Sequence, residues 1–126
     1  MINSFVLKVL PVICILTGVF LLQSLSFADV LQEQRAEVEH LLNFVKNSPC
    51  TFNRNGTKHP GKDSVKHIQK KYDYYKDDIK NTEDFIAYSA TKSMMSGKYY
   101  TVSCPDNKTI KSKDWLLNEL KLIRKK

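Results

Sequence analysis

Cysteine is scarce in this 126-residue chain, which carries only Cys14, Cys50 and Cys104. Neither Cys50 nor Cys104 has a second Cys or a His at the close spacing of a zinc knuckle, which argues against that class of metal site. The chain also lacks internal repeats and low-complexity tracts. These absences favour one ordinary globular domain over a repeat array or a zinc-bound module.

A complete set of catalytic motifs is also missing. Ser89-Ala90-Thr91-Lys92 matches the Ser-x-x-Lys string of serine acyl-enzymes. The partner Ser-Asp-Asn string is absent, the chain is far shorter than such enzymes, and Ser89 falls inside a predicted helix. A metal site built from His40, His59 and His67 has no tight ligand spacing. We therefore assign no catalytic residue and expect neither a cofactor nor a bound metal.

The only long apolar run lies at the start of the chain. Lys8 precedes an apolar stretch from Val9 to Leu22, and Ser26-Phe27-Ala28 places small residues on both sides of a bulky one. This order is typical of a secretory signal peptide, residues 1–28, with cleavage after Ala28. The strongly apolar stretch is shorter than the roughly 20 residues that a spanning helix needs. An uncleaved membrane anchor is therefore the less favoured alternative.

Cleavage would leave residues 29–126 as a single exported domain without Cys14. In an oxidising compartment the two remaining cysteines, Cys50 and Cys104, predict one disulfide, and a two-cysteine metal site is the alternative. A domain of this size buries only about 60–65% of its unfolded surface. We therefore expect a covalent bridge to contribute substantially to its stability.

The chain is basic, with 20 Lys and Arg against 13 Asp and Glu and a formal net charge of +7. Lys8 leaves with the signal peptide, which reduces the charge by one. A basic exported protein meets anionic envelope components and acidic proteins rather than nucleic acid. Basic and acidic residues are interspersed through 58–84, however, which favours a charged surface that confers only solubility over a dedicated polyanion site.

Helical spacing of apolar residues predicts four helices. In the first, Val38, Leu41 and Val45 share one face, and Ser48-Pro49 ends the helix. Asn81 or Thr82 is expected to cap the third helix, and Ser112 the fourth. The predicted helices cover 30–47, 62–76, 82–93 and the segment from 113 onward.

Turn signals and β propensity predict a small sheet. Asn55-Gly56 separates Thr51-Phe52 from Thr57-Lys58 and indicates a tight turn or hairpin, because both residues tolerate positive φ. The tyrosine-rich segment 98–104 is the best strand candidate. We therefore predict an α+β fold with about four helices and a small two-stranded antiparallel sheet, stapled by one disulfide.

Six short motifs occur in order along residues 29–126. They are Glu39-x-Leu41-Leu42, Cys50-x-Phe52-x-Arg54-Asn55-Gly56-x-x-His59, His67-x-x-x-Lys71-Tyr72, Glu83-Asp84-Phe85-Ile86, Ser96-Gly97-Lys98-x-Tyr100-x-Val102-x-Cys104-Pro105 and Asp114-Trp115-Leu116-x-x-Glu119-Leu120. This ordered set resembles the YfeK-like family of small exported proteins of Gram-negative bacteria, which is classed as a domain of unknown function. The resemblance covers nearly all of residues 29–126. It implies a periplasmic or secreted location and supports the Cys50–Cys104 pairing, but it supplies no activity or ligand.

Polar residues at the predicted turn form the first-choice binding site. A guanidinium and backbone N–H groups on a tight turn can hold a carboxylate or phosphate. His67 and Lys71 are four residues apart, so they share a helical face and could complete a basic pocket. The alternatives are an Arg54 that pairs with a nearby acid and a His67 that only packs. The predicted binding residues are Arg54, Asn55, Lys58, His59, His67 and Lys71.

These residues favour a non-enzymatic module that binds an anionic envelope component or an acidic protein. The alternative function is a small hydrolase or proton-transfer enzyme that uses His59 or His67 with a Ser or a carboxylate. An inhibitor of a host lysozyme is disfavoured, because such lysozymes are usually basic themselves. Tyr74 and Tyr99, which should point away from the apolar stripes, are candidate exposed platforms.

Overall fold

The computed structural model describes residue 30 and residues 32–106 and 108–126. The predicted signal peptide and its cleavage site lie outside the described residues. Within the described part of the chain, no helix is long and apolar enough to cross a membrane.

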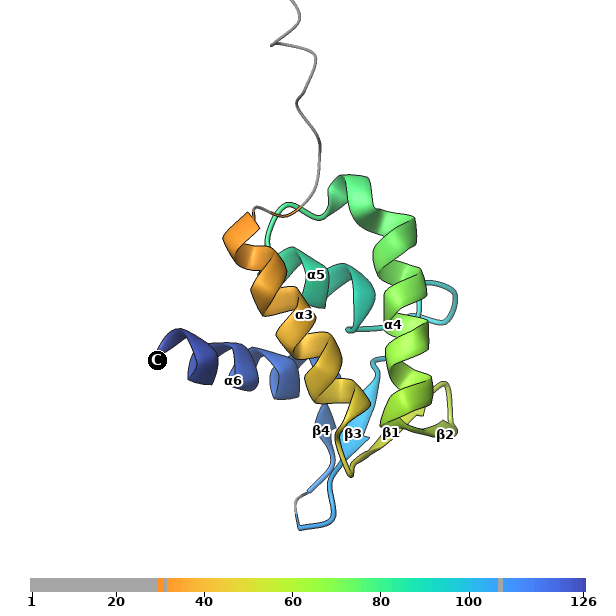
Figure 1. Cartoon of the computed structure of the whole chain (residues 1–126). Helices are drawn as coiled ribbons and strands as arrows, with labels where there is room; N and C mark the ends of the chain where they lie inside the picture. Colours follow the sequence, from red (N-terminus) through yellow and green to blue (C-terminus); the bar gives the residue numbers. More distant parts are fainter. Residues whose placement is uncertain (1–29, 31, 107) are drawn as a thin grey trace, which may run out of the picture.

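The described residues form four α-helices, as the periodicity predicted, and Figure 1 shows their arrangement. Helix α3 spans Gln32–Lys46, α4 spans Gly61–Tyr75, α5 spans Thr82–Ser89 and α6 spans Ser112–Arg124. A short 3₁₀ turn, η2, covers Lys76–Asp78. Helices α3, α4 and α5 pack against one another, and α6 contacts α3, α5 and the sheet.

Helix α4 can begin in direct contact with α3 because its first residue, Gly61, has no side chain. A Cβ atom at this position would overlap the carbonyl oxygen of Val45, near the end of α3. The glycine therefore lets the first turn of α4 lie directly against α3. Ser64, Ile68 and Tyr72 follow at intervals of four residues and form the buried face of α4.

Helix α5 is capped as predicted but ends earlier. The Asn81 side-chain oxygen accepts a 2.7 Å hydrogen bond from the Asp84 amide. The helix ends at Ser89 instead of near Ser93, because the chain then enters a backbone-bonded turn. In that turn the Ser93 amide donates to the Lys98 carbonyl, and Gly97 adopts a φ of 72°.

The predicted cap of α6 is wrong. Ser112 is the first residue of the helix, Lys111 occupies the N-cap position, and no side chain caps the helix. The Ser112 hydroxyl is instead buried without a hydrogen-bond partner among the described residues. The preceding residues, Ile110 and Lys111, are paired as a strand, and that pairing sets where the helix begins.

The sheet has four antiparallel strands rather than the predicted two. Strands β1, Thr51–Arg54, and β2, Thr57–Pro60, form a hairpin through Asn55 and Gly56, which have φ values of 54° and 85°. Strand β3, Thr101–Ser103, pairs with β1, and β4, Ile110–Lys111, pairs with β3. The order is β2-β1-β3-β4. β4 has only two residues, too few to show a period in the sequence.

The predicted disulfide between Cys50 and Cys104 is confirmed. Cys50 precedes β1 and Cys104 follows β3, and the pairing of Thr51 with Ser103 brings the two cysteines together. The bridge covers one end of a core that contains Phe52 and Val102 from the sheet together with buried residues of all four helices. Sheet and helices are thus joined both by packing and by a covalent link.

Candidate functional site

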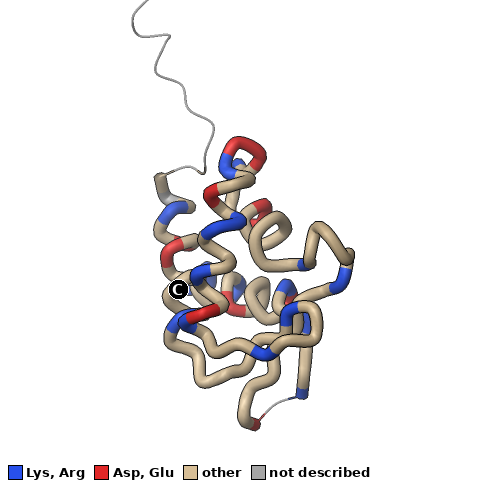
Figure 2. The backbone as a smooth tube through the Cα atoms, turned by 90° about the vertical axis from the view of Figure 1, so that its right-hand side faces the viewer, with Lys and Arg blue, Asp and Glu red and all other residues tan. Residues whose placement is uncertain are grey.

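A groove with a basic lining runs between α4, the β1–β2 turn and the loop that follows α5. Its volume is about 500 Å³. Although Lys and Arg are interspersed with Asp and Glu over the fold (Figure 2), no carboxylate of the described residues lines this groove. We call it the basic groove. Its lining residues are Arg54, Asn55, His67, Lys70, Lys71, Tyr74, Tyr75, Ser93, Met94, Met95 and Tyr100.

Strand and helix periodicity explain why the basic residues meet. Arg54 is two residues after the buried Phe52, so both side chains leave β1 on the face that the helices cover. His59 lies directly opposite Phe52 in the hairpin and shares that face. His67 and Lys71 lie one turn apart on α4 and both contact Tyr100.

The hydroxyl of Tyr100 joins His67 to Lys71. Lys71 Nζ donates to Tyr100 Oη at 3.2 Å and to the Lys92 carbonyl at 2.7 Å. His67 Nε2 lies 3.2 Å from the same Tyr100 oxygen. Because an ammonium can only donate, the Tyr100 hydroxyl is free to donate to a neutral His67. The polar chain therefore runs from Lys71 through Tyr100 to His67.

Burial and neighbouring cations shift the pKa values of these three hydrogen-bonded side chains. Burial, followed by the charges of Arg54, Lys71, His59 and Lys70, lowers the pKa of His67 to about 4. Burial and then Arg54 lower the pKa of Lys71, whereas burial raises that of Tyr100. At neutral pH His67 and Tyr100 are uncharged, so Arg54, Lys70 and Lys71 carry the charge of the groove.

Arg54 has no carboxylate partner among the described residues. Its neighbours in the groove are His67, Lys70 and Lys71, and no ion pair or side-chain hydrogen bond holds its half-buried guanidinium. Pairing with a nearby acid, the alternative role for Arg54, is thus not what the described residues show. A half-buried guanidinium surrounded by cations is an arrangement that an anion would stabilise.

The structure places the six predicted residues in two locations. Arg54, Asn55, His67 and Lys71 line the basic groove, where Asn55 accepts a 2.7 Å hydrogen bond from the Ser96 hydroxyl. Lys58 and His59 line a separate hollow beside the segment that ends at Cys50. Of these two residues, only His59 influences the basic groove, because its charge contributes to lowering the pKa of His67.

Several lining residues were missed by the sequence reasoning. Lys70 and Tyr74 lie three and seven residues after His67, a spacing that could have indicated the same helical face. Tyr74 and Tyr99 are exposed, as predicted, but only Tyr74 lines the groove. The loop residues Met94 and Met95, the latter fully exposed, had no signal in the sequence.

A small cavity of about 30 Å³ lies beneath the basic groove. Arg54, His67 and Tyr100 line both spaces. The buried hydroxyls of Ser64 and Ser112 also line this cavity and have no hydrogen-bond partner among the described residues. This cavity therefore holds two buried hydroxyl groups behind the side chains that it shares with the basic groove.

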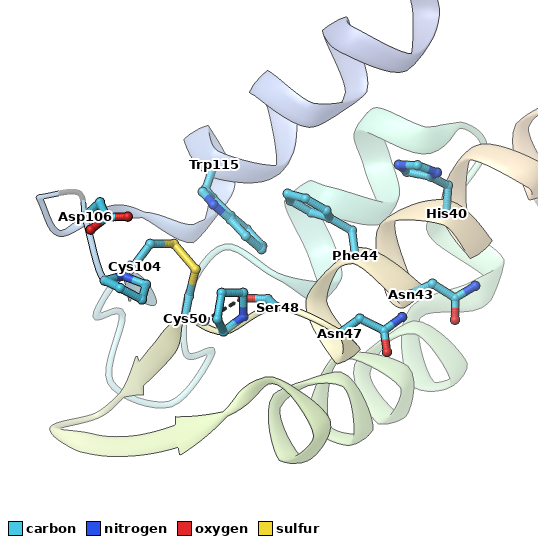
Figure 3. A pocket seen from close by; sticks show the side chains of 11 residues that line it. His40, Asn43, Phe44, Asn47, Ser48, Cys50, Cys104, Asp106 and Trp115 are labelled. Carbon is cyan, nitrogen blue, oxygen red and sulfur yellow. Dashed lines mark hydrogen bonds between the residues drawn. A yellow bond between two sulfur atoms is a disulfide. The ribbon is translucent and has the colours of Figure 1, made fainter.

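A second, larger groove lies beside the disulfide, and Figure 3 shows it from close by. Its volume is about 630 Å³. The side chains come from one face of α3, the two cysteine segments and the first turns of α6. We call it the aromatic groove. Its lining residues are His40, Asn43, Phe44, Asn47, Ser48, Pro49, Cys50, Cys104, Pro105, Asp106 and Trp115.

Stacked rings form one wall of the aromatic groove. The rings of Phe44 and Trp115 lie 4.4 Å apart with an interplanar angle of 25°, and Phe52 contacts Trp115 edge-on at 5.4 Å. His40 Nε2 lies 2.7 Å from Glu119 Oε2 and links α3 to α6. The sequence reasoning did not identify this groove, because its walls come from segments far apart in the chain.

No group of three or more His, Cys, Asp or Glu side chains is placed to hold a metal ion in the part of the chain that the structure describes. His40 lines the aromatic groove, His59 the hollow beside Cys50 and His67 the basic groove. The three histidines of the conceivable metal site therefore lie in three different places.

No curated protein and no solved structure matches this chain. The finer resemblance to YfeK-like proteins and the Gram-negative origin stay predictions. A family model described as a family of unknown function (DUF5329) matches residues 32–124, which extend from the first residue of α3 to the last residue of α6. Because the match covers well over half of the sequence, the chain belongs to the DUF5329 family.

Proposed function

We propose that this protein is an exported binding module that holds an anionic group in the basic groove. The observation that carries the proposal is Arg54, a half-buried guanidinium without a carboxylate partner among the described residues, in a groove lined by Lys70 and Lys71 and by no acid. An anion there would gain charge-assisted hydrogen bonds without first breaking an internal ion pair.

The protonation states support binding over proton transfer. A His67 with a pKa of about 4 is a weak base at neutral pH, and the raised pKa of Tyr100 keeps that hydroxyl protonated. Both groups are instead suited to donate or accept hydrogen bonds around a bound anion. The hydrolase or proton-transfer function that uses His59 or His67 stays a hypothesis, and Lys58 and His59 are not part of the proposed contact set.

The ligand class follows from the mixed lining. Tyr74, Met94 and Met95 supply a flexible apolar wall next to the cations, and all three are well exposed. A small inorganic anion would leave this wall in water. An anion joined to an apolar part, such as an envelope component with an acidic headgroup or an acidic protein segment, would contact both.

An exported location is part of the proposal. The disulfide between Cys50 and Cys104 is expected to persist in an oxidising compartment, and periplasmic or secreted proteins meet anionic envelope components directly. Non-reducing mass spectrometry of the exported protein tests this step. The expected mass corresponds to residues 29–126 with both thiols oxidised, whereas free thiols or retention of residues 1–28 would contradict it.

Calorimetric titration with phenyl phosphate and with inorganic sulfate tests the site. Phenyl phosphate carries a ring for the apolar wall, so it should bind more tightly than sulfate. Arg54→Gln should weaken phenyl phosphate binding at least about tenfold, because it removes a charge-assisted contact. Met95→Ser should reduce the preference for phenyl phosphate over sulfate.

Lys66→Gln is the matched control. Lys66 is an exposed residue of α4 that does not line the groove, so its replacement changes the net charge equally without touching the site. Arg54→Gln and Lys66→Gln should therefore differ in affinity but not in melting temperature. Equal affinities for the two variants would reduce the binding to a general effect of net charge and overturn the proposed site.

A further inference from the structure

We propose that the aromatic groove is a second, independent site that binds neutral sugar residues. None of the Lys and Arg side chains that the structure describes lines this groove, and Asp106 contributes a negative charge. The two grooves thus have opposite electrostatic character. An anion suited to the basic groove would be repelled here, whereas an uncharged ligand would enter without an electrostatic cost.

The walls of the groove are rigid before any ligand arrives. On one side the backbone is restricted by the disulfide, by Pro49 immediately before Cys50 and by Pro105 immediately after Cys104. The stacked pair of Phe44 and Trp115 closes the other side, as Figure 3 shows. A ligand would therefore meet a preformed aromatic wall, which reduces the entropy lost on binding.

Four polar side chains of the groove have no partner among the described residues, whereas His40 contacts Glu119 and the Ser48 hydroxyl accepts from the Cys50 amide. The side chains of Asn43, on α3, and of Asn47, the residue after its end, make no hydrogen bond with the described residues, and neither do the Asp106 carboxylate and the indole N–H of Trp115. Together they present several donors and acceptors close to the ring wall. Figure 3 shows the two amides on the α3 side and Asp106 at the far end of the groove.

Sugar rings fit this combination better than a purely apolar ligand does. The C–H face of a pyranose stacks on an aromatic ring, while its hydroxyls exchange hydrogen bonds with amides and carboxylates. An apolar ligand would cover Asn43, Asn47 and Asp106 without replacing their bonds to water, which is unfavourable. The groove volume of about 630 Å³ lies in the range of small-molecule sites.

Trp115 makes the test direct, because it is the only tryptophan in the chain. Titration with the tetramers of N-acetylglucosamine and of β-1,4-linked glucose should change the tryptophan emission until saturation, for at least one of the two. Asn47→Ala and Asp106→Ala should each weaken that binding by about three- to tenfold, the effect of one lost hydrogen bond. Both variants keep Trp115, whose emission reports binding.

Asn118→Ala is the matched control. Asn118 is an exposed asparagine of α6 that does not line the groove, so the same chemical change there should leave the affinity unaltered. Arg54→Gln, which disables the basic groove, should also leave it unaltered, so the two proposals fail separately. The inference is overturned if neither tetramer changes the emission up to about 10 mM, or if Asn47→Ala and Asn118→Ala bind alike.

Discussion

His67 should make the stability of this protein depend on pH between about 6.5 and 4. In the unfolded chain the imidazole has an ordinary pKa of 6.5, whereas burial and the cations of the basic groove lower the pKa to about 4 in the folded state. Between pH 6.5 and about 4 the His67 imidazole is therefore protonated in the unfolded state but neutral in the folded state. Stability is complete above pH 6.5 and is lost as the pH falls toward 4.

The size of this loss follows from the two pKa values. A difference between 6.5 and about 4 corresponds to roughly 3 kcal/mol, at about 1.4 kcal/mol for each tenfold change in proton affinity. The ring is half-buried, so water screens part of the penalty, and we expect a loss of about 1–2 kcal/mol between pH 7 and pH 4.5. His67→Gln should remove most of that loss, because the amide cannot be protonated.

Urea unfolding followed by circular dichroism at pH 7, 6, 5 and 4.5 measures the effect. The slope of unfolding free energy against pH should be positive for the natural chain and much smaller for His67→Gln. Lys66→Gln, on an exposed part of the same helix, should keep the natural slope. If His67→Gln lost as much stability as the natural chain between pH 7 and pH 4.5, the assignment of a buried neutral imidazole would be wrong.

Two further substitutions test the packing and the ion pairs of the fold. Gly61→Ala should lower the unfolding free energy by about 2 kcal/mol or more, because the new methyl group overlaps the Val45 carbonyl. The control is Gly56→Asn at the open turn, which should lower the unfolding free energy far less in the same urea titration. Arg124 bonds Glu37 at 2.7 Å and Glu83 at 2.9 Å and lowers the pKa of both carboxyls. The stability that these ion pairs contribute is present above pH 4.5 and is lost as the pH falls below it. Arg124→Gln should therefore lower the unfolding free energy by about 1 kcal/mol at pH 7 and reduce the decrease of melting temperature at acid pH. An unchanged decrease at acid pH would contradict the pairing.

Local patterns in the sequence were sufficient for most of the elements. The apolar spacing in 30–47 predicted α3, and Asn55-Gly56 predicted the hairpin, because each signal is contained within a few neighbouring residues. The pairing of Cys50 with Cys104 followed from having only two cysteines after the predicted cleavage. The fourth strand could not be predicted, because β4 exists only through its pairing with β3.

The candidate sites depended on contacts between distant segments. Sequence spacing placed His67 and Lys71 on one helical face, but their convergence on Tyr100 needed the chain to return beside α4 after α5. In the same way, Lys58 was grouped with Arg54 from sequence proximity, although strand alternation separates their side chains.

The sequence by itself determined the helices, the tight turn, the basic charge and the one cysteine pair that is left after the predicted cleavage. The tertiary structure alone decided that no acid of the described residues pairs with Arg54, that Arg124 instead joins Glu37 and Glu83, and that an aromatic groove lies beside the disulfide. The physical reason is range: backbone preferences act over a few residues, whereas charge pairing and groove formation depend on segments that only folding brings together.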